Sequence, residues 1–180
     1  MSTLAVAAWI MGTLAVGVGL FSACAPSLVR QGIQVLPRSV WPGRILLAID
    51  MAWAAYAVTT LHLGTFDPWK VHLYWLAPVC IILGSLYLDE LLSVRALGGL
   101  LLLVVGPILS AVRVNPSDWR LVVSVIAYVW ILVGLVFLLE PWWFRRLCTP
   151  FIEKDGLIRA GGLFKAAIGF GLIALAFWVY

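Results

Sequence analysis

Residues 4–24 read LAVAAWIMGTLAVGVGLFSAC, an unbroken apolar run without a charged side chain. A helix needs about 20 apolar residues to cross the hydrocarbon core of a bilayer, because each residue adds about 1.5 Å along the helix axis. The run therefore predicts a membrane-spanning helix. A secretory signal peptide is the alternative, but the basic start of such a segment is missing from residues 1–24.

Composition extends this prediction to the whole chain. Of the 180 residues, 64% are hydrophobic and only 11% are charged, and the mean hydropathy is +1.08. A soluble domain is about half apolar and about a quarter charged, so this chain has too few charges for a solvated surface. The high apolar content also excludes intrinsic disorder. Three cysteines are too few for a disulfide scaffold.

Apolar runs recur along the chain, and we expect an all-α polytopic membrane protein with six transmembrane helices in a single membrane domain. The helices would form three hairpins, residues 1–64, 65–115 and 116–180. Two shorter runs carry Pro78 and Pro107, which predicts a kinked hairpin, with a re-entrant pair as the alternative. The five runs after the first are Ile45–Leu63, Val71–Leu88, Ala96–Val112, Leu121–Leu139 and Ala160–Tyr180.

Orientation follows from the basic residues, which concentrate in cytoplasmic connectors of membrane proteins. In the six-helix arrangement one side carries three cations and the other side carries eight. We therefore predict that the eight-cation side is cytoplasmic and that both termini lie outside the cytoplasm. The smaller group is Lys70, Arg113 and Arg120; the larger is Arg30, Arg38, Arg44, Arg95, Arg145, Arg146, Lys154 and Arg159.

The first and last cytoplasmic connectors each show the pattern of a short amphipathic helix. After Pro26, apolar residues recur at helical spacing opposite Arg30, and after Pro141 they recur opposite Arg145 and Arg146. Such helices lie in the headgroup plane of a membrane. We expect interfacial helices in both connectors and basic interfacial residues at Arg30, Arg44, Arg145, Arg146 and Arg159; ordinary surface loops are the alternative.

The first and third hairpins also suggest an internal repeat. Shifting the sequence by 115 positions superposes Pro26 on Pro141 and Arg30 on Arg145 without a gap. Proline and arginine are scarce in this chain, which gives these identities weight. The hairpins are therefore expected to be parallel repeats related by an axis along the membrane normal.

One resemblance to a known family rests on two segments of the third hairpin. Residues 134–141 read GLVFLLEP and residues 155–162 read DGLIRAGG. Together they resemble the YjeT-like family, small two-helix bacterial inner-membrane proteins of unknown function, over about the last 60 residues. The resemblance implies a hairpin fold and a bacterial inner (plasma) membrane, and it implies no activity.

The candidate functional residues are Asp50 and Lys165, because ionisable side chains within the membrane are costly and mark functional sites. Asp50 lies six residues after Arg44, or about 9 Å along a helix. Lys165 occupies the equivalent position under the 115-residue shift. We predict an intramembrane Asp50–Lys165 ion pair. The alternatives are a snorkelling Lys165 with a hydrated or protonated Asp50, and a transport or relay role.

The histidines, the cysteines and the known catalytic motifs give weaker indications of a functional site. His62 and His72 could ligate haem or a metal, but both lie near predicted helix ends, where surface residence is the simpler interpretation, and the choice stays open. Cys24, Cys80 and Cys148 lack metal-ligand spacing. We find no catalytic triad, P-loop or dinucleotide fingerprint, so no catalytic, cofactor or metal site is predicted. Nucleic-acid binding has no support, because the +4 net charge lies on the cytoplasmic rim.

These observations favour a non-catalytic accessory or assembly subunit of a larger membrane complex, with the lipid bilayer and other membrane proteins as its partners. A small transporter or channel using Asp50 and Lys165 is the second hypothesis. A membrane enzyme that acts on lipid is the third, although the sequence leans away from an enzyme. Polar side chains that could line a pore are sparse in the predicted helices.

Overall fold

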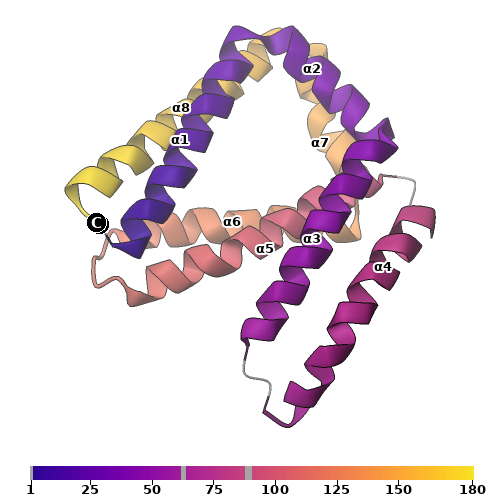
Figure 1. The fold of residues 1–180 in the computed structure, drawn as a ribbon. Helices are drawn as coiled ribbons and strands as arrows, with labels where there is room; N and C mark the ends of the chain where they lie inside the picture. Colours follow the sequence, from indigo (N-terminus) through magenta and orange to yellow (C-terminus); the bar gives the residue numbers. More distant parts are fainter. Residues whose placement is uncertain (1, 62–63, 88–90) are drawn as a thin grey trace. The chain divides into compact units, whose positions relative to one another are not determined.

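A computed structural model describes residues 2–61, 64–87 and 91–180 of the chain, and there the protein is all-helical, as predicted. Two short 3₁₀ segments, η1 (Leu36–Arg38) and η2 (Gly64–His72), flank the third α-helix (Figure 1). The α-helices of the described residues are α1 (Thr3–Cys24), α2 (Pro26–Val35), α3 (Val40–Thr60), α4 (Leu73–Tyr87), α5 (Leu92–Val114), α6 (Arg120–Leu139), α7 (Trp142–Glu153) and α8 (Asp155–Trp178).

Local sequence explains several helix ends. The Ser2 hydroxyl accepts a hydrogen bond from the Ala5 amide (3.1 Å) and so caps the first turn of α1. Pro26 is the first residue of α2, where the missing N–H costs nothing. Pro141 lies just before α7 in the same way. The prolines thus separate α1 from α2 and α6 from α7.

Four helices of the described chain, rather than the predicted six, are long and apolar enough to cross a membrane: α1, α5, α6 and α8. Of the six predicted spans, those at α3 and α4 do not reach this length and hydropathy. With 15 residues, α4 is only about 22 Å long, against about 30 Å of hydrocarbon core. The 21-residue α3 has the length, but Arg44, Asp50 and the two threonines at its end lower its hydropathy.

The connectors at residues 26–35 and 142–153 are helical, which confirms the helices expected there and excludes irregular loops. In α2, Leu28 is exposed on the face opposite Arg30 and Gln34. In α7, Leu147 and Phe151 lie opposite Arg145. Both helices are therefore amphipathic, whereas α1 is apolar on every side.

Contacts divide the chain into two compact units. Helices α5 and α6 are each divided between the two units. Unit 1 comprises residues 1–34, 104–132 and 145–180, and unit 2 comprises residues 35–103 and 133–144. This division does not follow the three predicted hairpins, because α1 of the first hairpin packs on α8 of the third.

Helices α1 and α8 form the closest helix pair of unit 1 (Figure 1). They run antiparallel, because Gly12 meets Gly169 while Gly19 meets Gly162. A Cβ atom at Gly19 would lie 2.6 Å from the carbonyl oxygen of Gly162, so the two backbones touch. Small residues permit this close approach in membrane helices. The face of α8 that packs on α1 contains Gly162, Ala166 and Gly169, whereas Gly171 faces open space.

The core of unit 1 joins this helix pair to the parts of α5 and α6 that border their connecting turn. Asn115 orders that turn: its side-chain oxygen accepts from the Ser117 amide (2.9 Å), and its carbonyl accepts from the Arg120 guanidinium (2.9 Å). The buried core side chains are Leu4, Ala8, Met11, Val105, Ile108, Val112, Val123, Ala127, Leu172 and Ala176.

Unit 2 contains α3, α4, the first part of α5 and the end of α6. Gly43 of α3 lies against Ser93 of α5, and Asp50 of α3 lies against Gly99 of α5. From the first contact to the second, the residue number rises on both helices, so α3 and α5 run parallel. The Ser93 hydroxyl joins them by donating to the Ser39 carbonyl (2.6 Å).

Candidate functional site

Asp50 is the most unusual side chain of unit 2. Only 3% of its surface is exposed, although it carries a carboxylate. Among the described residues its Oδ1 atom has no hydrogen-bond partner. A buried charge without a partner costs several kcal/mol or more, so proteins keep such groups mainly where they serve a purpose. Asp50 is therefore a candidate on structural grounds as well, and its predicted position within the membrane stays a prediction.

Gly99 makes room for this carboxylate on the neighbouring helix. A Cβ atom at position 99 would lie 2.9 Å from Oδ2 of Asp50, which is closer than packed atoms normally approach. The parallel course of α3 and α5 thus brings the carboxylate against bare backbone. Sequence reasoning did not assign a role to Gly99, although the Gly98–Gly99 pair within an apolar run is a signal of close helix packing.

Two half-buried cations lie on the same two helices as Asp50 and Gly99. Arg44 lies six residues before Asp50 on α3, and Arg95 lies one turn before Gly99 on α5. The Nε atom of Arg95 is buried and has no hydrogen-bond partner among the described residues. A carboxylate and an arginine, both incompletely satisfied, therefore lie within a few helical turns of each other in one unit.

Lys165, the predicted partner of Asp50, lies on α8 with its side chain exposed. It belongs to unit 1, whereas Asp50 belongs to unit 2. The Asp50–Lys165 ion pair therefore stays a prediction. Asp50 is buried, whereas Lys165 is exposed.

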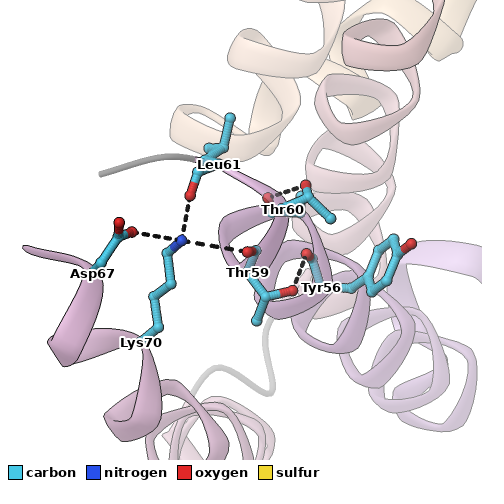
Figure 2. A network of polar contacts seen from close by, with 7 residues as sticks. Tyr56, Thr59, Thr60, Leu61, Asp67 and Lys70 are labelled. Atoms are coloured by element: carbon cyan, nitrogen blue, oxygen red, sulfur yellow. Dashed lines mark hydrogen bonds and ion pairs between the residues drawn. The ribbon is translucent and has the colours of Figure 1, made fainter. Parts of the chain in front are cut away.

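A second polar group, at the carboxyl end of α3, surrounds Lys70 (Figure 2). The Lys70 ammonium pairs with Asp67 (2.7 Å) and donates to the carbonyls of Leu61 and Thr59. The last carbonyls of a helix have no intrahelical partner and carry partial negative charge, so a cation there is stabilising. Lys70 was used in the sequence only to orient the chain; its contacts fasten η2 to the end of α3.

Of the two candidate histidines, His72 is exposed in η2, and His62 lies outside the described residues. The cysteines are free, and burial raises the pKa of the Cys148 thiol on α7. Within the described parts of the chain, no three His, Cys, Asp or Glu side chains gather as a metal site would require.

The predicted interfacial arginines have different environments. Arg30 forms an ion pair with Asp155, the first residue of α8. Arg44 is half-buried on α3. Arg145, Arg146 and Arg159 are exposed. The five arginines thus differ in exposure: Arg30 and Arg44 are half-buried, and the other three are exposed.

No protein family, curated protein or solved structure matches the chain. The resemblance of the last hairpin to the YjeT-like family therefore stays a prediction.

Proposed function

We propose that this chain is a non-catalytic accessory or assembly subunit of a larger complex in a bacterial inner membrane. The observation that carries the proposal is α4, none of whose described side chains is buried. Its exposed residues include Trp75, Leu76, Val79 and Leu83. A helix so poorly covered by its own chain needs another surface to cover it.

Lipid alone is a poor cover for α4. The helix is about 8 Å shorter than a typical hydrocarbon core, and short apolar helices relieve such a mismatch by local thinning or by association with other helices. Trp75 is 78% exposed, and on the neighbouring α3 Tyr56 is 69% exposed. Tryptophan and tyrosine are enriched both where proteins bind one another and at the membrane–water interface, so it is the short length of α4 that favours a protein partner over lipid.

Native purification in mild detergent tests the proposal. We expect a stoichiometric partner to co-elute with the wild-type chain. The double variant Trp75→Ala with Leu76→Ala should lose this partner, because it removes two exposed side chains of α4. Trp178→Ala is the matched control: Trp178 is 88% exposed at the end of α8, and its loss should leave the partner bound. A homogeneous homo-oligomer without a partner would overturn the proposal.

The second candidate function is a small transporter that uses Asp50, with or without Lys165. Its support is the buried carboxylate whose Oδ1 atom lacks a partner among the described residues. Such a group can bind a proton or a monovalent cation. In proteoliposomes, Asp50→Asn should fold normally and abolish a proton or sodium flux. If the variant only lowers stability, Asp50 has a structural role, and this result favours the subunit proposal over the transporter.

We also propose that the first and third hairpins are two copies of one repeated sequence. Under the 115-residue shift, the end of α1 at Cys24 falls on the end of α6 at Leu139. The start of α3 at Val40 falls on the start of α8 at Asp155. These coincidences support two copies of one hairpin, with Asp50 in the first copy and Lys165 at the equivalent position of the second.

A further inference from the structure

Helices α2 and α7 lie at the same end of unit 1. The α1–α8 pair is antiparallel, so the end of α1 at Cys24 is close to the start of α8 at Asp155. The chain enters α2 directly after α1, and it leaves α7 directly before α8. An Arg30–Asp155 ion pair ties α2 to the first turn of α8.

A contact between α7 and α8 fixes the second helix at the same place. The ring of Phe151 lies 3.5 Å from the position that a Cβ atom at Gly161 would occupy. Both amphipathic helices are thus held at this end of unit 1 by contacts to α8. We call the four basic residues there, Arg145, Arg146, Lys154 and Arg159, the basic end.

At the basic end four cations face two carboxylates, Glu153 at the end of α7 and Asp155 at the start of α8. Asp155 is already engaged by Arg30. The side chains of Arg145, Lys154 and Arg159 are exposed, and none of them has an ion-pair partner among the described residues. At the opposite end of unit 1, Arg120 is held by the Asn115 carbonyl. Exposed cations therefore outnumber exposed carboxylates at this end, and anions from outside the chain can neutralise them; Arg113 and Lys165 are exposed cations of the unit that lie elsewhere.

The faces of α7 fit the boundary between headgroups and acyl chains. Leu147 is 49% exposed and Phe151 is 39% exposed on one face, and Arg145 and Thr149 lie on the opposite face. A helix with this division lies in the headgroup plane, with its apolar face toward the acyl chains. Its cations then lie at the level of the lipid phosphates.

We propose that the basic end binds the phosphates of anionic phospholipids, with Arg145, Arg146 and Arg159 as the main ligands. Guanidinium groups suit this role because they donate two parallel hydrogen bonds to phosphate oxygens. Helix α7 lies along the membrane surface and presents these cations to the headgroup layer. The proposal concerns a lipid surface and does not depend on whether α4 binds a protein partner.

Native mass spectrometry of the full-length protein, purified in detergent and supplied with equal amounts of phosphatidylglycerol and phosphatidylcholine, tests this proposal. We expect preferential retention of phosphatidylglycerol. Each cation near a membrane surface contributes about fivefold to anionic lipid binding, so the triple variant Arg145→Gln, Arg146→Gln, Arg159→Gln should lose most of the preference. Arg113→Gln is the control, because Arg113 is an exposed cation outside the basic end.

The outcomes separate clearly. Loss of the preference in the triple variant but not in Arg113→Gln, with helicity retained by circular dichroism, supports the basic end. Equal retention of phosphatidylglycerol by the wild type and the triple variant overturns it. An equal loss in Arg113→Gln also overturns it, because binding would then follow net charge. If the triple variant keeps the lipid but releases a co-purifying acidic protein, the basic end binds protein rather than lipid.

Discussion

Asp50 shows how far residue-scale reasoning reaches. Its depth along a helix and its short side chain were evident from the sequence, and the structure buries it. Its neighbour Gly99 could not be predicted, because the contact depends on the parallel course of α3 and α5. Depth is a local property of one helix, whereas the neighbour of a side chain depends on which helices pack together.

The predicted Asp50–Lys165 pair can be tested by a double-mutant cycle. If the pair forms in a dry environment, Asp50→Ala should lower the free energy of unfolding by about 3–5 kcal/mol, because it leaves an uncompensated charge. Adding Lys165→Ala should recover much of this loss. Unfolding in a denaturing detergent measures both values. Additive losses would show that the two residues do not interact energetically.

Gly99 offers a test of the Asp50 environment that does not involve Lys165. Gly99→Ala should destabilise the protein by about 1–3 kcal/mol, because the new Cβ would lie against Oδ2 of Asp50. Gly106 lies on the same helix with nothing within 4 Å, so Gly106→Ala should stabilise it by up to about 1 kcal/mol. The Asp50→Ala background should convert Gly99→Ala from a loss to a gain. A loss that persists in that background would place the clash elsewhere.

Tyr180 gives a pH-dependent prediction. Its hydroxyl donates to the Trp119 carbonyl (2.6 Å), and burial raises the pKa of the phenol above its ordinary value of 10.0. Because the folded pKa is the higher one, the contribution is fully present below pH 10 and is lost as the pH rises through the folded pKa. Tyr180→Phe should therefore cost about 1 kcal/mol at pH 7 and progressively less at high pH. Thermal unfolding at several pH values measures this difference, and a constant difference would contradict the assignment.

At the scale of helices, the glycines of the α1–α8 pair are the clearest case. A Cβ atom at Gly19 would lie 2.6 Å from both the Gly162 carbonyl and the Ala166 amide. These are backbone atoms, so the whole of α8 must shift. Gly19→Ala should therefore lower the free energy of unfolding by about 1–3 kcal/mol or more. Gly17, on the same helix with nothing within 4 Å, is the matched control and should gain stability as alanine. Equal effects at both positions would refute the close pair.

Helix positions were largely predictable because apolar runs and prolines are local signals. The expected run Leu4–Cys24 became α1, and the expected run Leu121–Leu139 became α6, each with ends that agree to one residue. The predicted run Val71–Leu88 was less accurate, since η2 continues to His72 and only 15 residues remain for α4. The 3₁₀ segment depends on contacts of Lys70 with the end of α3, which periodicity along the sequence does not reveal.

At the scale of the whole molecule, composition predicted the membrane class but not which helices cross. The antiparallel α1–α8 pair places helices from the first and third hairpins together, a long-range pairing that hydropathy alone does not contain. In an antiparallel pair α1 and α8 would cross the membrane in opposite directions, and the side on which the termini lie stays a prediction. The boundary between the two compact units falls within α5 and within α6.

The number of crossings leads to the last prediction. If only α1, α5, α6 and α8 cross, then α3 and α4 form a hairpin that enters and leaves on the cytoplasmic side. The crossing count falls by two, so the connectors before and after this hairpin keep their sides. Pro68, in η2 between α3 and α4, is therefore the position at which four and six crossings differ.

Impermeant maleimide labelling of single cysteines, in a background in which the native cysteines are replaced, distinguishes the two counts. A cysteine introduced at Pro68 should not react with reagent added from outside, whereas one at Asp118, in the exposed turn between α5 and α6, should react. Cysteines at Ser39 and Lys154 should react only from the cytoplasm. Labelling of position 68 from outside would show that α3 and α4 do cross, and that α4 achieves this despite its length only with a thinned bilayer or a partner around it.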